Sequence, residues 1–102
     1  MKTQDILWRL KNLDEWFNGD QWWRELFNTH KKIIKQACLD LVDRLELLGS
    51  FSDAISSKQF AVLFNGVFQP ELSIHPHMQE ELIALLFKDD HNYQKEVCDY
   101  LQ

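Results

Sequence analysis

Six side chains in the C-terminal third of the chain are of types that bind metal ions: His75, His77, Glu81, Asp89, Asp90 and His91. His77 and Glu81 lie one helical turn apart, a spacing at which two side chains can hold one ion. His75 and His91 would join them only if two loops converge. However, the set matches no established metal-ligand spacing, and histidines on either side of a proline at a helix start commonly cap and solvate that end. We therefore expect no metal and no cofactor.

Catalytic patterns do not occur in the sequence. There is no glycine-rich phosphate loop, no Gly-x-Ser-x-Gly, no His-Glu-x-x-His and no Cys-x-x-Cys. The acidic pairs at 80–81 and 89–90 are consecutive, so in a helix their side chains diverge by about 100°. Such pairs are typical of surface charge rather than of an acid–base couple. We predict that the protein is not an enzyme.

Cys38 and Cys98 are the two cysteines of the chain. The first residues carry charges throughout and no small-residue cleavage site, which argues against a signal peptide. No apolar run approaches the roughly 20 residues of a membrane span. Reduced thiols in a cytoplasmic protein without membrane contact are therefore expected.

Charge is divided unevenly along the chain, whose formal net charge is −5. Residues 1–50 hold eight basic and eight acidic residues, whereas residues 51–102 hold three basic and eight acidic ones. The acidic half suits a partner protein with a basic surface. A cluster of Lys31, Lys32 and Lys35 offers an alternative, a nucleic-acid-associated regulator, but the low pI and the lack of an arginine-rich segment disfavour it.

The stretch from residue 20 to 48 must organise the fold, because apolar side chains recur there at intervals of three or four. These residues are Trp23, Phe27, His30, Ile34, Ala37, Leu41, Leu45 and Leu48. Asp20 is expected to cap the start and Gly49 to end the helix. The spacing predicts one helix of about 40 Å, or two coaxial helices with a break near residues 28–29. We expect His30, at the centre of this face, to be neutral and bonded to a carbonyl or carboxylate.

Shorter helices are predicted on both sides of this stretch. A helix over 4–17 has the apolar seam Ile6, Leu10, Leu13 and Phe17, and residues 18–20 form a turn. After a loop from residue 69 to 75, Pro76 begins another helix, and a short last helix follows from about residue 93.

Residues 60–68 allow two structures. Ser56 to Gln59 matches a Ser-x-x-Gln capping box, which favours a helix with Phe60, Phe64 and Phe68 on one face. Asn65-Gly66 is also a strong signal for a type I′ hairpin turn. We favour the helix, with residues 65–66 as its C-cap or a kink, because residues 60–64 do not alternate in polarity.

Together these patterns predict an all-α fold: one helical domain over residues 1–102, a bundle of about five helices around the long central one. Some apolar side chains lie off the predicted seams and are candidates for partner binding: Trp8, Trp22, Leu39, Val42 and Phe87. The protein's own helices could instead cover Trp8 or the Leu39–Val42 pair, and the apolar run 82–87 could lie between helices or in a subunit contact. We expect a non-enzymatic protein-binding module, an adaptor, regulator or inhibitor. A homodimer would cover several of these side chains at once.

Overall fold

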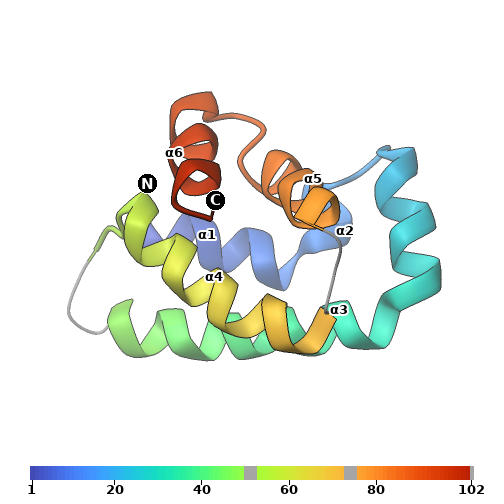
Figure 1. Cartoon of the computed structure of the whole chain (residues 1–102), viewed down its shortest axis with the longest axis horizontal. Coiled ribbons are helices and arrows are strands. Elements are labelled where there is room, and N and C mark those ends of the chain that lie inside the picture. The colour runs from blue at the N-terminus through green and yellow to red at the C-terminus, as the bar shows by residue number, and fades with distance from the viewer. Residues whose placement is uncertain (50–52, 73–75, 102) are drawn as a thin grey trace.

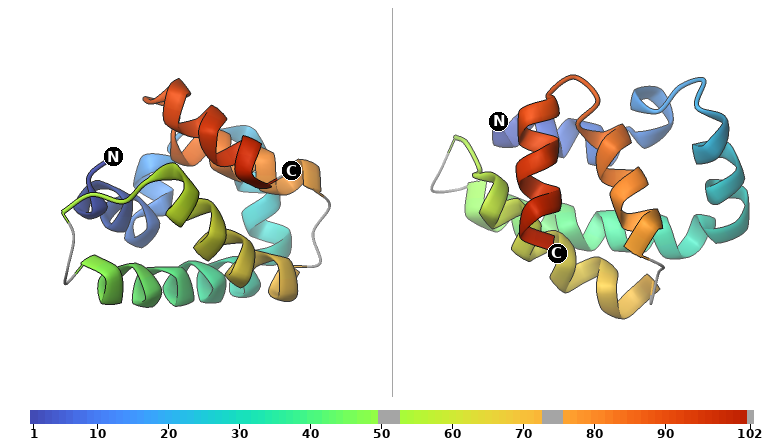
Figure 2. Two further views of the ribbon diagram at one scale, coloured as in Figure 1. Left: turned by 60° about the vertical axis from the view of Figure 1, so that its left-hand side comes forward. Right: turned by 45° about the horizontal axis from the view of Figure 1, so that its top comes forward.

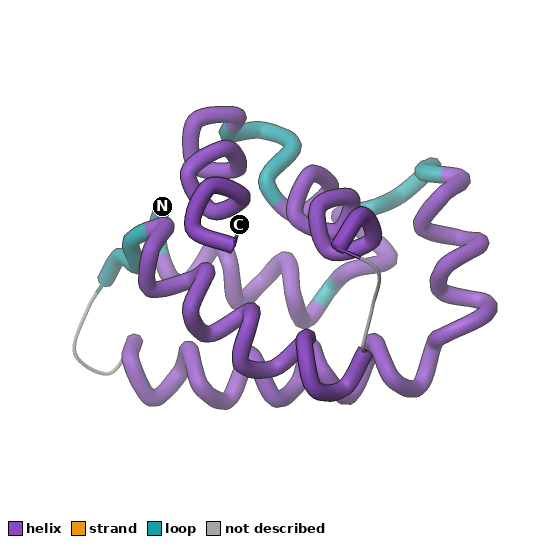
Figure 3. Tube along the Cα trace, viewed as in Figure 1, coloured by secondary structure: helices purple, strands orange, loops and turns teal. Residues whose placement is uncertain are grey.

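The computed structural model describes residues 1–49, 53–72 and 76–101 (Figure 1), and it leaves undescribed the side chains of 26, 27, 31, 48, 49, 69–72 and 76–78. The described residues form six helices: α1 (Thr3–Lys11), α2 (Leu13–Trp16), α3 (Gln21–Gly49), α4 (Ser57–Leu72), α5 (Pro76–Leu86) and α6 (His91–Leu101). The predicted all-α fold is confirmed. Figure 3 shows helix in most of the trace, with loops confined to the connections.

The helices pack around α3, whose second segment runs along one side of the molecule. α4 returns antiparallel beside it, and α1 lies on its other flank (Figure 1). α6 crosses α4, and α5 lies next to α6 (Figure 2). The fully buried side chains at the centre include five phenylalanines, Phe17, Phe60, Phe64, Phe68 and Phe87. Within the described ranges, no helix is long and apolar enough to cross a membrane.

The first predicted helix is two helices, because Asn12 interrupts it with φ −127° and ψ 47°. Its side-chain amide donates to the backbone oxygen of Trp8 at 2.8 Å. Asparagine commonly competes with helical hydrogen bonds in this way. The single helix over 4–17 was therefore wrong, but the predicted seam (Ile6, Leu10, Leu13 and Phe17) is buried as expected.

α3 begins as predicted. The backbone N–H of Trp23 donates to the Asp20 carboxylate at 2.8 Å, so Asp20 caps the helix. Gly19, in the turn before it, has φ +85°, a conformation that glycine adopts without strain.

The middle of α3 differs from the prediction. His30, half-buried, has non-helical angles of φ −127° and ψ 27°. The helix turns sharply there, so its two segments point in different directions (Figure 1). The predicted break near residues 28–29 is confirmed, one position further on, but its two segments are not coaxial. The alternative of one straight 40 Å rod was wrong, since the bend brings α1 back over the second segment. The hydrogen bonding of His30 stays a prediction.

α4 confirms the helix over the hairpin for residues 60–68. Its capping box is reciprocal: the Gln59 N–H donates to the Ser56 hydroxyl, and the Ser56 N–H donates to the Gln59 side chain, each at 3.2 Å. The helix continues through residues 65–66 to Leu72, so the expected C-cap and the start of the loop at 69 were wrong. At Gly66, an added Cβ would lie 3.1 Å from a guanidinium nitrogen of Arg44, so glycine permits a close approach of α3.

Backbone contacts fix the N-terminus against the segment before α4. The Thr3 N–H donates to the Asp53 oxygen at 3.0 Å, and the Ile55 N–H donates to the Met1 oxygen at 3.2 Å. The pairing is an isolated bridge between Lys2 and Ala54. Among the residues that the structure describes, this bridge does not extend into a strand.

Cys38 makes stability depend on alkaline pH. Both cysteines are free, and burial raises the pKa of the Cys38 thiol to about 12. Since the unfolded thiol ionises near pH 9, ionisation favours the unfolded chain above that pH. We expect the free energy of unfolding to fall by about 1.4 kcal/mol per pH unit once the pH exceeds 9. Urea titrations between pH 8 and 10 measure this slope.

The matched control is Cys38→Ala, which should lose the part of this pH dependence that Cys38 causes, whatever its own stability, and keep a smaller part from Cys98. Burial, with Glu80 and Asp99 nearby, also raises the pKa of Cys98, but that thiol is only partly covered. Cys98 should therefore react with iodoacetamide before Cys38. An unchanged alkaline slope in Cys38→Ala would show that the buried thiol does not cause the effect.

Candidate partner-binding surface

Trp8 lies on the outer face of α1 with 47% of its surface exposed. Its ring meets the edge of Trp16 at a centroid distance of 6.3 Å, so one side of the indole is supported and the other faces solvent. Of the two alternatives for this residue, cover by the protein's own fold is excluded. A half-exposed indole on a rigid helix is a common anchor for protein contacts.

The Leu39–Val42 pair is divided by the fold. Leu39 is 54% exposed, whereas Val42 is 4% exposed and belongs to the core. A residue three positions on is rotated by about 60° around a helix, which here turns Val42 toward the interior. Val42 is therefore not part of a surface patch, and Leu39 remains as a single exposed leucine on the second segment of α3.

Leu39 lies at the edge of a groove of about 370 Å³ between α3 and the break at Asn12. The lining residues are Leu10, Lys11, Asn12, Leu13, Asp14, Glu15, Lys35, Cys38 and Leu39. Leu10, Leu13 and Cys38 are buried and form an apolar floor. Charged side chains of both signs form the rim, and Lys11 pairs with Glu46 of α3 at 2.8 Å. The groove can receive an apolar side chain with polar groups around it.

The other two candidates, Trp22 and Phe87, pack against the core, the first in part and the second completely. Trp22 is half-buried and packs against the core. Phe87 is 0% exposed and meets the rings of Phe60 and Tyr93 at 5.0 and 4.7 Å. The apolar run 82–87 therefore lies between helices, and Phe87 is not available to a partner in this fold.

The alternative sites can be placed only in part. Lys32 and Lys35 are exposed, while the side chain of Lys31 lies outside the described residues. His75 and the side chain of His77 also lie outside them. In the part of the chain that the structure describes, no three histidine, cysteine or acidic side chains group as metal ligands.

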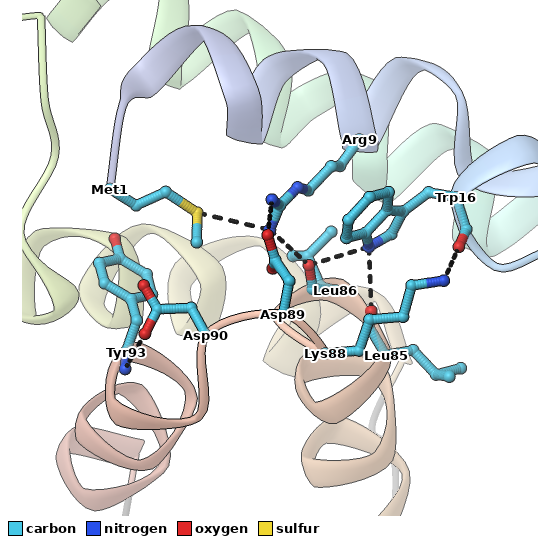
Figure 4. A network of polar contacts seen from close by, with 9 residues as sticks. All are labelled: Met1, Arg9, Trp16, Leu85, Leu86, Lys88, Asp89, Asp90 and Tyr93. Carbon is cyan, nitrogen blue, oxygen red and sulfur yellow. Dashed lines mark hydrogen bonds and ion pairs between the residues drawn. The ribbon is translucent and has the colours of Figure 1, made fainter.

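Arg9 forms a buried polar network that the sequence reading missed (Figure 4). One guanidinium nitrogen donates to the Leu86 oxygen at 3.1 Å, and the other pairs with the Asp89 carboxylate at 2.6 Å. The guanidinium also lies over the Trp16 ring, 4.1 Å from its centroid. Arg9 lies on the same buried seam as Ile6, Leu10 and Leu13, and a buried cation requires a partner. This position in the sequence could have indicated that Arg9 has a buried partner.

Trp16 completes the network at the C-terminal end of α5. Its indole N–H points at the oxygens of Leu85 and Leu86, 3.0 Å from each, and the Lys88 ammonium donates to the Trp16 backbone oxygen (Figure 4). These donors satisfy carbonyls that a helix end leaves without partners. The network fastens α1 and α2 to the end of α5.

Three further aliphatic side chains of α3 and α4 are exposed among the described residues: Ile33, Leu47 and Val62. They were not among the predicted partner-binding residues. Comparison of the chain with protein-family models, curated proteins and solved structures found no match.

Proposed function

We propose that the protein is a non-enzymatic protein-binding module of the cytoplasm, whose partner covers Trp8 and the groove beside Leu39. The supporting observation is that these two side chains stay exposed in a fold that buries the predicted seam of its first helix. An exposed indole has a solvation cost. When a partner buries such a side chain, it commonly contributes about 2 kcal/mol or more to the free energy of binding.

The groove and the net charge of the chain indicate what kind of surface the partner would have. An apolar side chain of the partner would rest on Leu10, Leu13 and Cys38, and its polar neighbours would meet the charged rim. The net charge of −5 favours a partner with a basic surface, because opposite charge raises the association rate and disfavours acidic competitors. A second copy of the chain is a further candidate partner. Lys32 and Lys35 alone give nucleic-acid binding too little support.

Replacement of Trp8 or Leu39 by alanine tests this proposal. Each change should weaken partner capture by about tenfold or more, since an interface anchor is lost. Thermal stability should change little, because neither side chain is in the core. Capture from a lysate of the source cells, compared by quantitative mass spectrometry, identifies proteins whose recovery depends on Trp8. Calorimetry with the purified protein then measures the affinity.

Tyr100→Ala is the matched control, because Tyr100 is also an exposed aromatic residue but lies on α6. It should leave capture unchanged. If the Trp8, Leu39 and Tyr100 variants all recover the same proteins in the same amounts as the original chain, the proposed surface is not the one that binds.

A further inference from the structure

The bend in α3 lies beside a threonine that bonds back to the helix: the Thr29 hydroxyl donates to the Glu25 backbone oxygen at 3.0 Å, a type of bond that often bends helices. Proline and glycine, the usual causes of sharp kinks, do not occur in residues 21–48. His30 alone has non-helical angles within the described backbone of this 29-residue element. The apolar spacing that predicts a helix continues on both sides of it. The sharp turn therefore depends on packing elsewhere as well as on this local bond.

The chain divides at His30 into an arm, residues 1–29, and a body, residues 31–101. The arm has contacts of its own: Phe17 meets Trp23 edge to face at 4.8 Å, and the Trp23 indole N–H donates to Asp14 at 3.3 Å. Figure 1 shows the first segment of α3, the last part of the arm, at one end of the molecule, where it meets the body at the bend. The arm can thus move as a unit when the angles of His30 change.

Specific contacts join the arm to the body. They include the ion pairs Arg9–Asp89 and Lys11–Glu46, the bonds from Trp16 to Leu85 and Leu86, and the backbone bond from Thr3 to Asp53. Each joins residues far apart in the sequence, up to 80 positions for Arg9 and Asp89. None requires that the arm and the body belong to the same molecule.

We infer that a second copy of this chain is a partner through exchange of the arms. With His30 helical, α3 becomes one rod of about 43 Å. The arm of one copy then docks on the body of the other, and both copies keep every arm–body contact. The exchanged dimer differs from the monomer in the two hinges, in new contacts along the straight helices and in the entropy of association. This inference does not depend on the proposed function.

A reciprocal charge exchange tests the dimer directly. One chain carries Arg9→Asp and the other Asp89→Arg, so each alone places like charges at the arm–body contact. In a mixed exchanged dimer, the arm of the Asp89→Arg chain brings Arg9 to Asp89 of the other chain, which is the original pair. The arm of the Arg9→Asp chain brings its new aspartate to the new arginine at position 89, which is the reversed pair. The two chains, unfolded together and refolded at equal amounts, should give a 1:1 complex by light scattering and native mass spectrometry.

The control is the double variant Arg9→Asp/Asp89→Arg, in which a single chain contains the reversed pair. If that variant folds as a monomer and the mixture gives no 1:1 complex, arm exchange is overturned. If the mixture alone folds and dimerises, the arms have been exchanged, because another interface between copies would not restore the pairs.

A pair of hinge variants keeps the inference testable if the reversed pair does not fold. His30→Ala and His30→Gly lose the same side-chain contacts but differ in helix propensity at both hinges of the dimer. The alanine variant should therefore dimerise about 30-fold more tightly than the glycine variant. Sedimentation equilibrium after refolding measures both constants. Equal constants, or tighter association of the glycine variant, would overturn the inference.

Discussion

Replacing Phe87 with alanine is expected to lower the free energy of unfolding by about 3–5 kcal/mol. The ring is fully buried just after α5 and meets both Phe60 and Tyr93. Its removal leaves a cavity between α4, α5 and α6, because close-packed interiors collapse only in part around a missing ring. Urea titration followed by tryptophan fluorescence measures the change.

Trp8→Ala is the control, since it removes a larger aromatic side chain from the surface and should change stability by about 1 kcal/mol or less. The contrast separates core from partner surface among the side chains that the sequence singles out. Equal destabilisation by the two changes would contradict the placement of Trp8 outside the core.

Removing the carboxylate of Asp89 is expected to cost about 2–4 kcal/mol, because Asp89→Ala leaves the buried guanidinium of Arg9 without its anion. The Asp89 side chain is 49% exposed and that of Arg9 is 8% exposed, so solvent can replace only part of the lost interaction. Arg9→Met should cost less, since methionine fills the space over Trp16 and leaves Asp89 to be solvated. The same urea titrations measure both variants.

The double variant Arg9→Met/Asp89→Ala completes a mutant cycle. Its stability should resemble that of Arg9→Met alone, because the second change removes an anion that no longer has a buried partner. Additive losses would show that the two residues act independently. The loss of stability in each single variant would then have to be attributed to other contacts, such as that of Arg9 with the indole of Trp16.

The sequence correctly predicted those parts of the fold that depend on residues close together in the chain. The Asp20 cap, the Ser56–Gln59 box and the buried seam of the first helix each depend on residues within a few positions, and the structure confirms all three. The same is true of the choice of helix for residues 60–68. These features follow from hydrogen-bond chemistry and helical periodicity alone.

The errors arose where distant residues decide the conformation. The sequence indicates a break near residues 28–29 but not the sharp turn at His30, which lets α1 pack on the second segment of α3. Val42 and Phe87 lie off the predicted seams, but α3 and α5 are covered on more than one side, which widens the buried face. The partner of Arg9 is 80 positions away, so no local pattern could identify it. Partner binding at Trp8 and Leu39 stays a prediction.

α1 lies near the start of the chain, but the residues that bind its arginine lie near the end, and this order matters during synthesis on the ribosome. The Arg9 side chain is translated well before Leu86 and Asp89, 77 and 80 residues later. At roughly 5–20 residues per second, the Arg9 guanidinium waits about 4–16 s for the carbonyl and the carboxylate that bind it. α1 can therefore pack on α3 early in synthesis, but its attachment to the end of α5 has to wait until the last part of the message is read.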